Sequence, residues 1–186
     1  ESGVKFHLKK EVGKHISFQE LEKDYDAILV ATGVYKARQL DIETKNIENS
    51  LPALDFLIES NRVGLGDVPS KNKFLDAKDK HVVVIGGGDT AMDCVRTAVR
   101  QKAKEVTCLY RRNKENMPGS AREVLNAEQE GVKFSWLSVP SKIISQDKSA
   151  SSLAYKVAAL GEADETGRRK PIDTGVEKQI KSDLII

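Results

Sequence analysis

A glycine-rich loop between a predicted strand and a predicted helix constrains this chain more than any other feature of its sequence. His81–Ile85 is an apolar, β-branched run typical of a buried strand, and Asp89–Gln101 carries apolar residues at helical spacing. Between them, the residues from Gly86 to Ala91 fit the pattern G-x-G-x-x-A. The pattern alone is weak, but its place directly after a strand and before a helix predicts a dinucleotide-binding loop.

Each position of this loop has a physical reason if the loop binds a dinucleotide. Gly86 allows the tight turn, and Gly88 has no side chain to keep the backbone away from a pyrophosphate. Ala91 lets the helix pack close to the strand. The helix amides and the positive end of the helix dipole then face the phosphates. The alternative is a glycine turn that only connects a strand to a helix.

The end of the next strand indicates which dinucleotide is bound. A site for NAD usually carries Asp or Glu there, whose carboxylate accepts a hydrogen bond from the ribose 2′-hydroxyl. Here the strand Glu105–Tyr110 is followed directly by Arg111 and Arg112. Guanidinium groups bind a 2′-phosphate through charge-assisted hydrogen bonds of about 1.5–3 kcal/mol, so the sequence predicts NADPH over NADH. A solvated basic turn that continues through Lys114 is the alternative.

The elements after this strand predict an α/β fold. A helix over Ser120–Glu130, ended by Gly131, and a strand over Val132–Leu137 complete an alternating succession of strands and helices. This succession indicates a parallel sheet with right-handed crossovers. The pattern changes after Pro140. There we expect two short strands, a charged loop and a final strand, over Lys142–Gln146, Leu153–Gly161, Glu162–Gly175 and Ser182–Ile186.

The first 80 residues are less regular. Val4, Phe6 and Leu8 alternate with other residues, as in a half-buried strand, and Ser17 and Glu20 have the spacing of a helix capping box. The further elements expected here are a helix ending near Lys23, a buried strand within Asp26–Gly33, a helix over Ala53–Asn61 with Leu54, Leu57 and Ile58 on one face, and a linker over Val63–Asp79.

The composition excludes several functions. The 186 residues include 30 Lys+Arg and 28 Asp+Glu, and a net charge of +2 is too small to hold nucleic acid or an acidic membrane through bulk charge. The apolar runs are far shorter than a membrane span and no N-terminal signal pattern is present, so we expect a soluble, intracellular protein. The chain begins at Glu1 and stops in an apolar run, from which we expect a piece of a longer polypeptide.

No residue pattern indicates a metal site or a catalytic group. Cys94 and Cys108 lack a CxxC or Cys/His neighbour, so we expect buried, reduced thiols. His7, His15 and His81 are scattered over edge and loop positions, which is typical of surface residues. We therefore predict no metal ligand and no catalytic residue in this chain.

Ala31–Gly33 is a lesser signal. In flavoproteins with two dinucleotide-binding domains, an A-T-G tripeptide closes the strand on which the chain leaves the flavin domain for the inserted nicotinamide domain. Here the tripeptide precedes the glycine loop by about 50 residues, and the terminal apolar run resembles the strand on which the chain returns. Thr32 and Gly33 are therefore expected near a flavin, with an ordinary strand-ending turn as the alternative.

The sequence also resembles a known family along nearly its whole length. Glu105–Arg112 with Asn116–Pro118, and the segment Ala31–Arg38, are similar to the small (β) subunits of NADPH-dependent glutamate synthases, as are Tyr155–Val157 and Gly167–Pro171. The flavin–NADPH half of dihydropyrimidine dehydrogenase and subunits of the ferredoxin:NADP oxidoreductase type share this domain. The motifs therefore identify this superfamily, related to the pyridine nucleotide-disulfide oxidoreductases, better than one member.

The resemblance implies a fold and a reaction. The fold is a Rossmann-like parallel sheet with helices and a β-meander, the NAD(P)-binding domain of a flavoprotein with two dinucleotide-binding domains. Residues 1–50 would be the C-terminal edge of the FAD domain and a connector, and residues 51–186 the NADPH domain, cut at the strand that returns to the FAD domain. In this family NADPH reduces FAD, and iron–sulfur clusters carry electrons to the large subunit, which forms glutamate from glutamine and 2-oxoglutarate.

This chain has no second glycine fingerprint for FAD and no cysteine set for clusters, so the resemblance implies FAD and iron–sulfur clusters outside it and an inactive chain when isolated. Matched residue by residue, the implied pyrophosphate site is Gly86, Gly87, Gly88, Asp89, Thr90 and Ala91. Arg111 and Arg112 would bind the 2′-phosphate, and Thr32 and Gly33 would lie at the junction with the flavin.

The implied partners are NADPH and the large subunit, in the cytoplasm, with no nucleic acid and no membrane. Two alternatives stay open. The same domain could serve another electron acceptor, such as a ferredoxin or a pyrimidine-reducing module. It could also be a non-catalytic module that senses a nucleotide or uses the fold as a scaffold, because a fold alone implies no activity.

Overall fold

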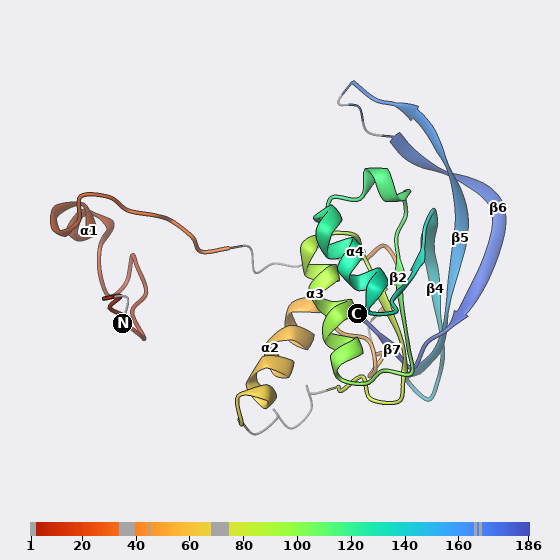
Figure 1. Cartoon of the computed structure of the whole chain (residues 1–186), viewed down its shortest axis with the longest axis horizontal. Coiled ribbons are helices and arrows are strands. Elements are labelled where there is room, and N and C mark those ends of the chain that lie inside the picture. The colour runs from red at the N-terminus through yellow and green to blue at the C-terminus, as the bar shows by residue number, and fades with distance from the viewer. Residues whose placement is uncertain (1–2, 34–39, 45, 68–74, 166, 168) are drawn as a thin grey trace. The chain divides into compact units, whose positions relative to one another are not determined.

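The structure is a computed structural model that describes residues 3–33, 40–44, 46–67, 75–165, 167 and 169–186 (Figure 1). The chain divides into two compact units, Glu1–Tyr35 and Lys36–Ile186. The described part of the first unit contains one short helix, whereas that of the second contains two β-sheets and several helices.

The first unit contains the short helix α1 (Phe18–Asp24), and Ser17 is its N-cap. The Glu20 N–H donates to Ser17 Oγ (3.1 Å), and the Ser17 N–H donates to a Glu20 carboxylate oxygen (2.7 Å). This geometry confirms the predicted capping box, which satisfies amides that the helix start leaves without partners. The hydrogen bonds from the Ser17 side chain and backbone also lower the pKa of Glu20.

The two strands predicted in this unit are wrong. Both runs, over residues 4–8 and 26–32, have irregular backbone, and their large side chains are exposed: Phe6 by 81% and Leu29 by 88%. Among the described residues, neither run pairs with another strand. An apolar or alternating pattern forms a strand only where a neighbour accepts its backbone hydrogen bonds, and the described part of this unit offers none.

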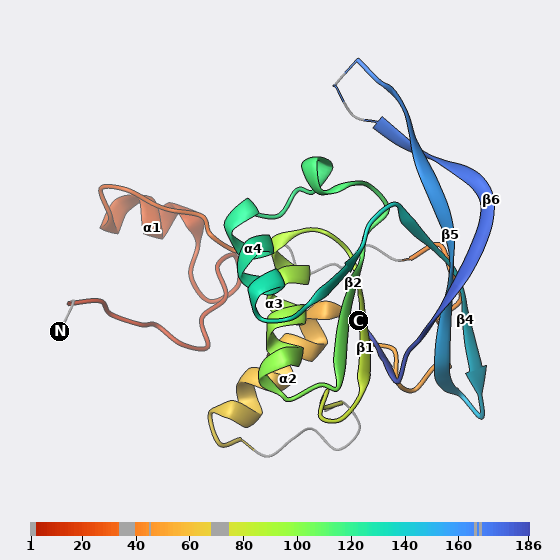
Figure 2. The ribbon, with the colours of Figure 1, turned by 45° about the vertical axis from the view of Figure 1, so that its right-hand side comes forward.

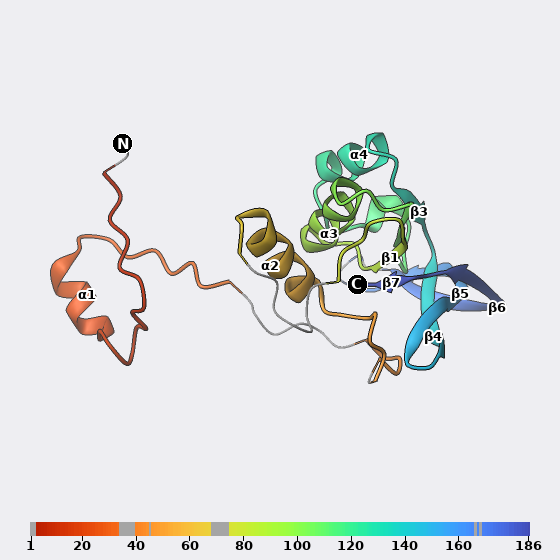
Figure 3. The same ribbon diagram turned by 90° about the horizontal axis from the view of Figure 1, so that it is seen from below.

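A four-stranded parallel sheet forms the centre of the second unit. Its strands lie in the order β3-β2-β1-β7, and each neighbouring pair is parallel. Their bounds are β1 (His81–Ile85), β2 (Glu105–Leu109), β3 (Lys133–Ser135) and β7 (Leu184–Ile185). One face is covered by the helices α2 (Ala53–Gly64), α3 (Asp89–Arg100) and α4 (Ala121–Gln129) (Figure 1; Figure 3). The predicted α/β class is confirmed.

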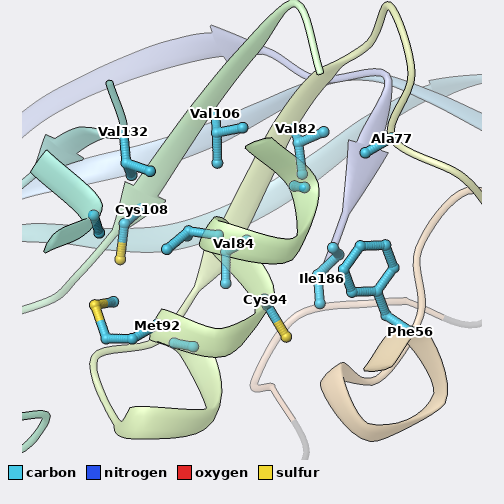
Figure 4. Packing of buried hydrophobic residues seen from close by; sticks show 14 of the residues in the cluster. Phe56, Ala77, Val82, Val84, Met92, Cys94, Val106, Cys108, Val132 and Ile186 are labelled. Carbon is cyan, nitrogen blue, oxygen red and sulfur yellow. The ribbon is translucent and has the colours of Figure 1, made fainter. Parts of the chain in front are cut away.

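Side chains alternate across the sheet and supply two apolar clusters. On the helix side, Val82 and Val84 of β1 pack with Cys94 of α3 and Cys108 of β2 (Figure 4). Val83 faces the other way. Cys94 and Cys108 are free and buried, as predicted, and burial raises the pKa of each thiol to about 12. These thiols are therefore protonated packing groups at neutral pH.

A three-stranded antiparallel sheet covers the second face of the parallel sheet (Figure 2). Its order is β4-β5-β6, with β4 (Ser138–Gln146), β5 (Ser149–Ala163) and β6 (Arg169–Lys181). Ile143 and Leu153 of this sheet pack against Val83, Leu109 and Ile185 of the parallel one. The antiparallel sheet thus forms the second apolar cluster together with the parallel sheet.

The charged loop predicted over Glu162–Gly175 is wrong. Most of it belongs to β5 and β6, where Leu160 pairs with Pro171 and Ala158 with Asp173. The side chains of β6 are nearly all exposed, and a strand with solvent on its outer face carries polar residues that resemble a loop in sequence. Pro171 fits because β6 is an edge strand of the described sheet.

The chain turns sharply between the two sheets. β3 ends at Ser135, earlier than predicted, and Leu137, with φ 54°, directs the chain into β4. The Leu137 N–H donates to the Arg112 carbonyl (3.0 Å), and the Ser138 N–H donates to the Tyr110 carbonyl (2.9 Å). The start of β4 is therefore fixed against the segment that follows β2.

Helix α2 continues beyond its predicted end at Asn61 into the predicted linker. Its predicted inner face is wrong at Ile58, which is 47% exposed, whereas Phe56 is 2% exposed and fills the core. Residues 68–74 of the predicted linker lie outside the described residues. The segment before α2 is fixed by Asn49, whose Nδ2 donates to the carbonyls of Ala150 and Asp183 (2.9 Å each).

Candidate functional site

The glycine loop lies at the carboxyl edge of the parallel sheet, between β1 and α3 (Figure 2). The Gly86 N–H donates to the Leu109 carbonyl at the end of β2 (3.1 Å), so the ends of β1 and β2 meet there. Gly86 has φ 151°, and a Cβ on it would lie 3.5 Å from Cβ of Ala91. The predicted order of strand, glycine turn and helix is confirmed, and open α/β sheets bind ligands at this edge.

Gly88 is the open position of the loop. It is the N-cap of α3, with extended backbone (φ −90°, ψ 174°), and its carbonyl accepts from the N–H groups of Ala91 (2.9 Å) and Met92 (3.2 Å). Among the described residues, no heavy atom outside its own chain neighbours lies within 4 Å of the place a Cβ would take. Thr90, in the first turn of α3, is exposed. An anion could therefore approach the positive end of the α3 dipole closely.

Gly87 is a glycine for a different reason. A Cβ on it would lie 2.5 Å from two carbons of the Tyr110 ring, which packs directly over the loop. Tyr110 is 7% exposed, and its hydroxyl donates to the Asn116 carbonyl (2.9 Å). Its ring also meets Trp136 edge-on at 6.4 Å between centroids. Sequence reasoning missed Tyr110, although an aromatic residue at the end of the second strand was the available signal.

The segment between β2 and α4 is fastened to the glycine loop at two points. The Gly119 N–H donates to the Gly87 carbonyl (2.9 Å), and the Ser120 N–H donates to a carboxylate oxygen of Asp89 (2.8 Å). A Cβ on Gly119 would lie 3.0 Å from the same Gly87 oxygen. Asp89, predicted among the pyrophosphate residues, therefore supports this segment with its side chain. Gly119 and Ser120 were missed by sequence reasoning because they are distant in the chain.

The two predicted arginines occupy different environments. Arg111 is exposed and lines a hollow of about 310 Å³ with Val139, Lys156, Ala158, Pro171 and Asp173. Arg112 is half-buried, and its Nε is buried with no hydrogen-bond partner in the part of the chain that the structure describes. Of the two, Arg111 is the more accessible to solvent.

The remaining candidates belong to other parts of the chain. Thr32 and Gly33 are exposed and belong to the first unit, and Gly33 has φ 69°. Their expected place near a flavin stays a prediction. His81 lies at the opposite, amino end of β1, where its Nδ1 lies 2.7 Å from Asp183. Burial acts to raise the pKa of Asp183, but the hydrogen bonds from His81 and the charge of Lys181 outweigh it and lower this pKa.

Within the described ranges, no group of three or more His, Cys, Asp or Glu side chains lies close enough together to hold a metal ion. None of the helices described is both long and apolar enough to cross a membrane.

A parallel sheet with a glycine loop at its carboxyl edge and a helix starting on that loop defines the class of dinucleotide-binding α/β domains. The sequence profile of pyridine nucleotide-disulphide oxidoreductases matches residues 2–183. The chain therefore belongs to the pyridine nucleotide-disulphide oxidoreductase family.

Similar curated proteins agree with this assignment. The chain is 48% identical to the "Glutamate synthase [NADPH] small chain" of Azospirillum brasilense over all of its length and 39% of that protein's. It is 41% identical to the protein of the same name from Escherichia coli K12, over 99% of the chain and 40% of that protein's length. The chain thus spans about two fifths of the length of these two relatives.

The fold also has a match among solved structures. T. acidophilum thioredoxin reductase superposes with a TM-score of 0.54 over 81% of this chain and 40% of its own, at 16% identity. At that identity the match supports the fold alone.

Proposed function

We propose that residues 51–186 form an NADPH-binding domain that delivers reducing equivalents to a flavin. Two features of the site carry this proposal together. Gly88 leaves open space at the start of α3, and Arg111 follows β2 at the position where a site for NAD carries a carboxylate. An acid at that position would repel a 2′-phosphate, whereas a guanidinium binds it.

The residues of the site fit this nucleotide. Gly88 and the first turn of α3, with Thr90 exposed, suit the pyrophosphate, and Arg111 suits the 2′-phosphate. Gly87 lets the Tyr110 ring pack on the loop, and Asp89 accepts a hydrogen bond from the Ser120 N–H, so both residues stabilise the loop. Hydride donation is chemistry that the nucleotide itself supplies when bound, so the task of this chain is to bind and orient it.

For the whole protein, we propose the role of a glutamate synthase small chain. FAD and iron–sulfur clusters would be bound by sequence beyond these 186 residues, and a large chain would be the partner, in the cytoplasm. Residues 1–50 would be the edge of the FAD domain and a connector, with Thr32 and Gly33 near the flavin. The identities of 48% and 41% to glutamate synthase small chains support this role.

The runner-up is an electron-input subunit for another acceptor. The β subunit of a Moorella thermoacetica "NADP(+)-dependent formate dehydrogenase" is 34% identical over 99% of the chain and 25% of its own length. The lower identity favours glutamate synthase. In the purified protein with its large chain, NADPH oxidation should require both glutamine and 2-oxoglutarate, whereas oxidation that needs neither would favour the runner-up.

NADPH binding is tested by calorimetric titration of the protein at its full natural length with NADPH and with NADH. NADPH should bind at least tenfold more tightly, and Arg111→Ala should remove that preference. Arg100→Ala, on the exposed end of α3, is the matched control and should change neither affinity. Equal binding of both nucleotides by the unmodified protein would contradict the proposal.

A further inference from the structure

The hollow beside Arg111 has walls that come from the antiparallel sheet. Val139 of β4, Lys156 and Ala158 of β5, and Pro171 and Asp173 of β6 line it, together with Arg111 from the segment after β2. The sheet that covers the second face of the fold therefore also reaches the carboxyl edge where a dinucleotide would bind (Figure 2). The glycine loop and the two arginines after β2 give no indication that these strands reach the site.

Backbone hydrogen bonds fix this wall in place. The Ala158 N–H donates to the Leu137 carbonyl (2.7 Å), and the Leu137 N–H donates to the Arg112 carbonyl (3.0 Å). Val139 pairs with Lys156 across β4 and β5, so the lysine is carried beside the segment that bears Arg111. Through Leu137, these hydrogen bonds tie the strand that carries Lys156 to the segment that carries Arg111.

A shift in strand register places a carboxylate beside the lysine. Lys156 pairs in register with Glu177, but β6 is irregular between Glu177 and Asp173, with Gly175 at φ 79°. As a result Asp173 reaches Lys156 Nζ at 2.7 Å, while Glu177 accepts from the Ser141 hydroxyl (2.7 Å). The hydrogen bond between Lys156 and Asp173 raises the pKa of the lysine and lowers that of the aspartate, so both are charged at neutral pH.

The charges of the lining favour an anion. Within the lining, Arg111 and Lys156 are cationic and Asp173 is the carboxylate, while Val139, Ala158 and Pro171 supply apolar walls. A second carboxylate, Glu177, lies opposite Lys156 on β6 and accepts a hydrogen bond from the Ser141 hydroxyl. The ion pair of Lys156 and Asp173 is about half exposed, at 50% and 46%, and such pairs exchange partners at little cost. Asp173 keeps a second partner in the Gly175 N–H (2.8 Å), so a phosphate can replace it beside the lysine.

We propose that this hollow is the subsite for the 2′-phosphate of NADPH, with Lys156 as the cationic partner of Arg111. The proposal rests on the proposed function and adds a specificity residue from the antiparallel sheet. When no phosphate is present, Asp173 forms the ion pair with Lys156. NADH offers no phosphate to displace it, so Lys156 contributes to the binding of NADPH alone.

The test compares Lys156→Gln with Lys178→Gln in the protein at its full natural length. Lys178 pairs with Tyr155 in β5, one residue from Lys156, and therefore points from the opposite face of the same sheet. Calorimetry measures the affinity for NADPH and NADH, and for 2′,5′-ADP and ADP as probes of the phosphate alone. Thermal melting checks that each variant is folded.

Lys156→Gln should lower the affinity for NADPH and for 2′,5′-ADP by about three- to tenfold, and added salt should reduce this difference. NADH and ADP should bind as before. Asp173→Asn should strengthen NADPH binding severalfold, because it frees the lysine. Lys178→Gln should change none of these affinities.

Two results separate this inference from the proposed function. If NADPH is preferred and Arg111→Ala removes the preference but Lys156→Gln leaves it intact, the subsite is wrong and the proposed function stands. An equal loss of NADPH and NADH in Lys156→Gln would likewise contradict a specificity role. If the unmodified protein binds both nucleotides alike or binds neither, both proposals fail.

Discussion

The two units of this chain carry similar apolar patterns and use them differently. In the second unit, Phe56 and Leu184 are buried because a sheet and three helices enclose them. In the first unit, Phe6 and Leu29 remain exposed because the described residues give them no opposing surface. The contrast shows that an apolar pattern produces a packed element only where a complementary surface lies in the same unit.

Replacing one phenylalanine in each unit tests this difference in packing most directly. Phe56→Ala should lower the free energy of unfolding by about 3–5 kcal/mol, because it removes a large side chain that is 2% exposed and leaves a cavity. Phe6→Ala, at 81% exposure, should change it by less than about 0.5 kcal/mol. Urea unfolding followed by circular dichroism measures both. Similar losses for the two variants would mean that Phe6 is packed in solution.

The same contrast between packed and open positions recurs inside the glycine loop. Gly87→Ala should cost about 1–3 kcal/mol of stability, because its Cβ meets the buried Tyr110 ring. Gly88→Ala should leave stability within about 0.5 kcal/mol, since its place is open, but should weaken NADPH at least tenfold by keeping the pyrophosphate away. Thermal melting and nucleotide titration of both variants check this, and an equal melting temperature for the two would contradict it.

The hydrogen bond from the Ser120 N–H to Asp89 predicts that Asp89 stabilises the segment before α4. Asp89→Ala removes the acceptor and should cost about 1 kcal/mol of local stability, seen as faster hydrogen exchange of the Ser120 amide. Asp89→Asn retains an acceptor oxygen and should preserve most of this protection. If both variants exchange as slowly as the unmodified protein, Asp89 does not fasten this segment.

The smallest expected effect concerns pH and again compares the units. The pKa of Asp183, in the second unit, is lower in the folded state than its unfolded value of about 4. The ionised carboxylate therefore stabilises the fold fully above the unfolded pKa, and this contribution is lost as the pH falls through the folded pKa. Asp183→Asn should therefore cost at most about 1 kcal/mol at pH 7, discounted for its 36% exposure, and the difference should vanish in strong acid. Glu20→Gln, in the first unit, should leave the melting of the second unit unchanged at any pH.

The central half of the fold could be predicted from the sequence because its signals are local. The valines of β1, the glycine turn and the apolar face of α3 follow one another directly, and local periodicity determines such elements. The capping box of Ser17 and Glu20 could be predicted for the same reason, because its two residues are three positions apart. Strand β6 and the two absent strands of the first unit were mispredicted because a strand depends on partners that are distant in sequence.

The candidate site shows the same division. The motif identified Gly86 and Gly88 together with the arginines after β2. It gave no sign that Tyr110 packs on Gly87, that Ser120 binds Asp89, or that Lys156 shares a hollow with Arg111. Those contacts join segments from 23 to 45 residues apart in the chain, and only the tertiary fold brings them together.

The proposed nucleotide site is tested most directly by mapping the backbone amide signals that shift in an NMR spectrum when NADPH is added. The shifts should concentrate on the glycine loop, the first turn of α3, Arg111 and the segment from Gly119 to Ser120. NADH should reproduce them except near Arg111 and Lys156. Shifts confined to the first unit, or the absence of shifts at the glycine loop at saturating NADPH, would contradict a nucleotide site at this edge of the sheet.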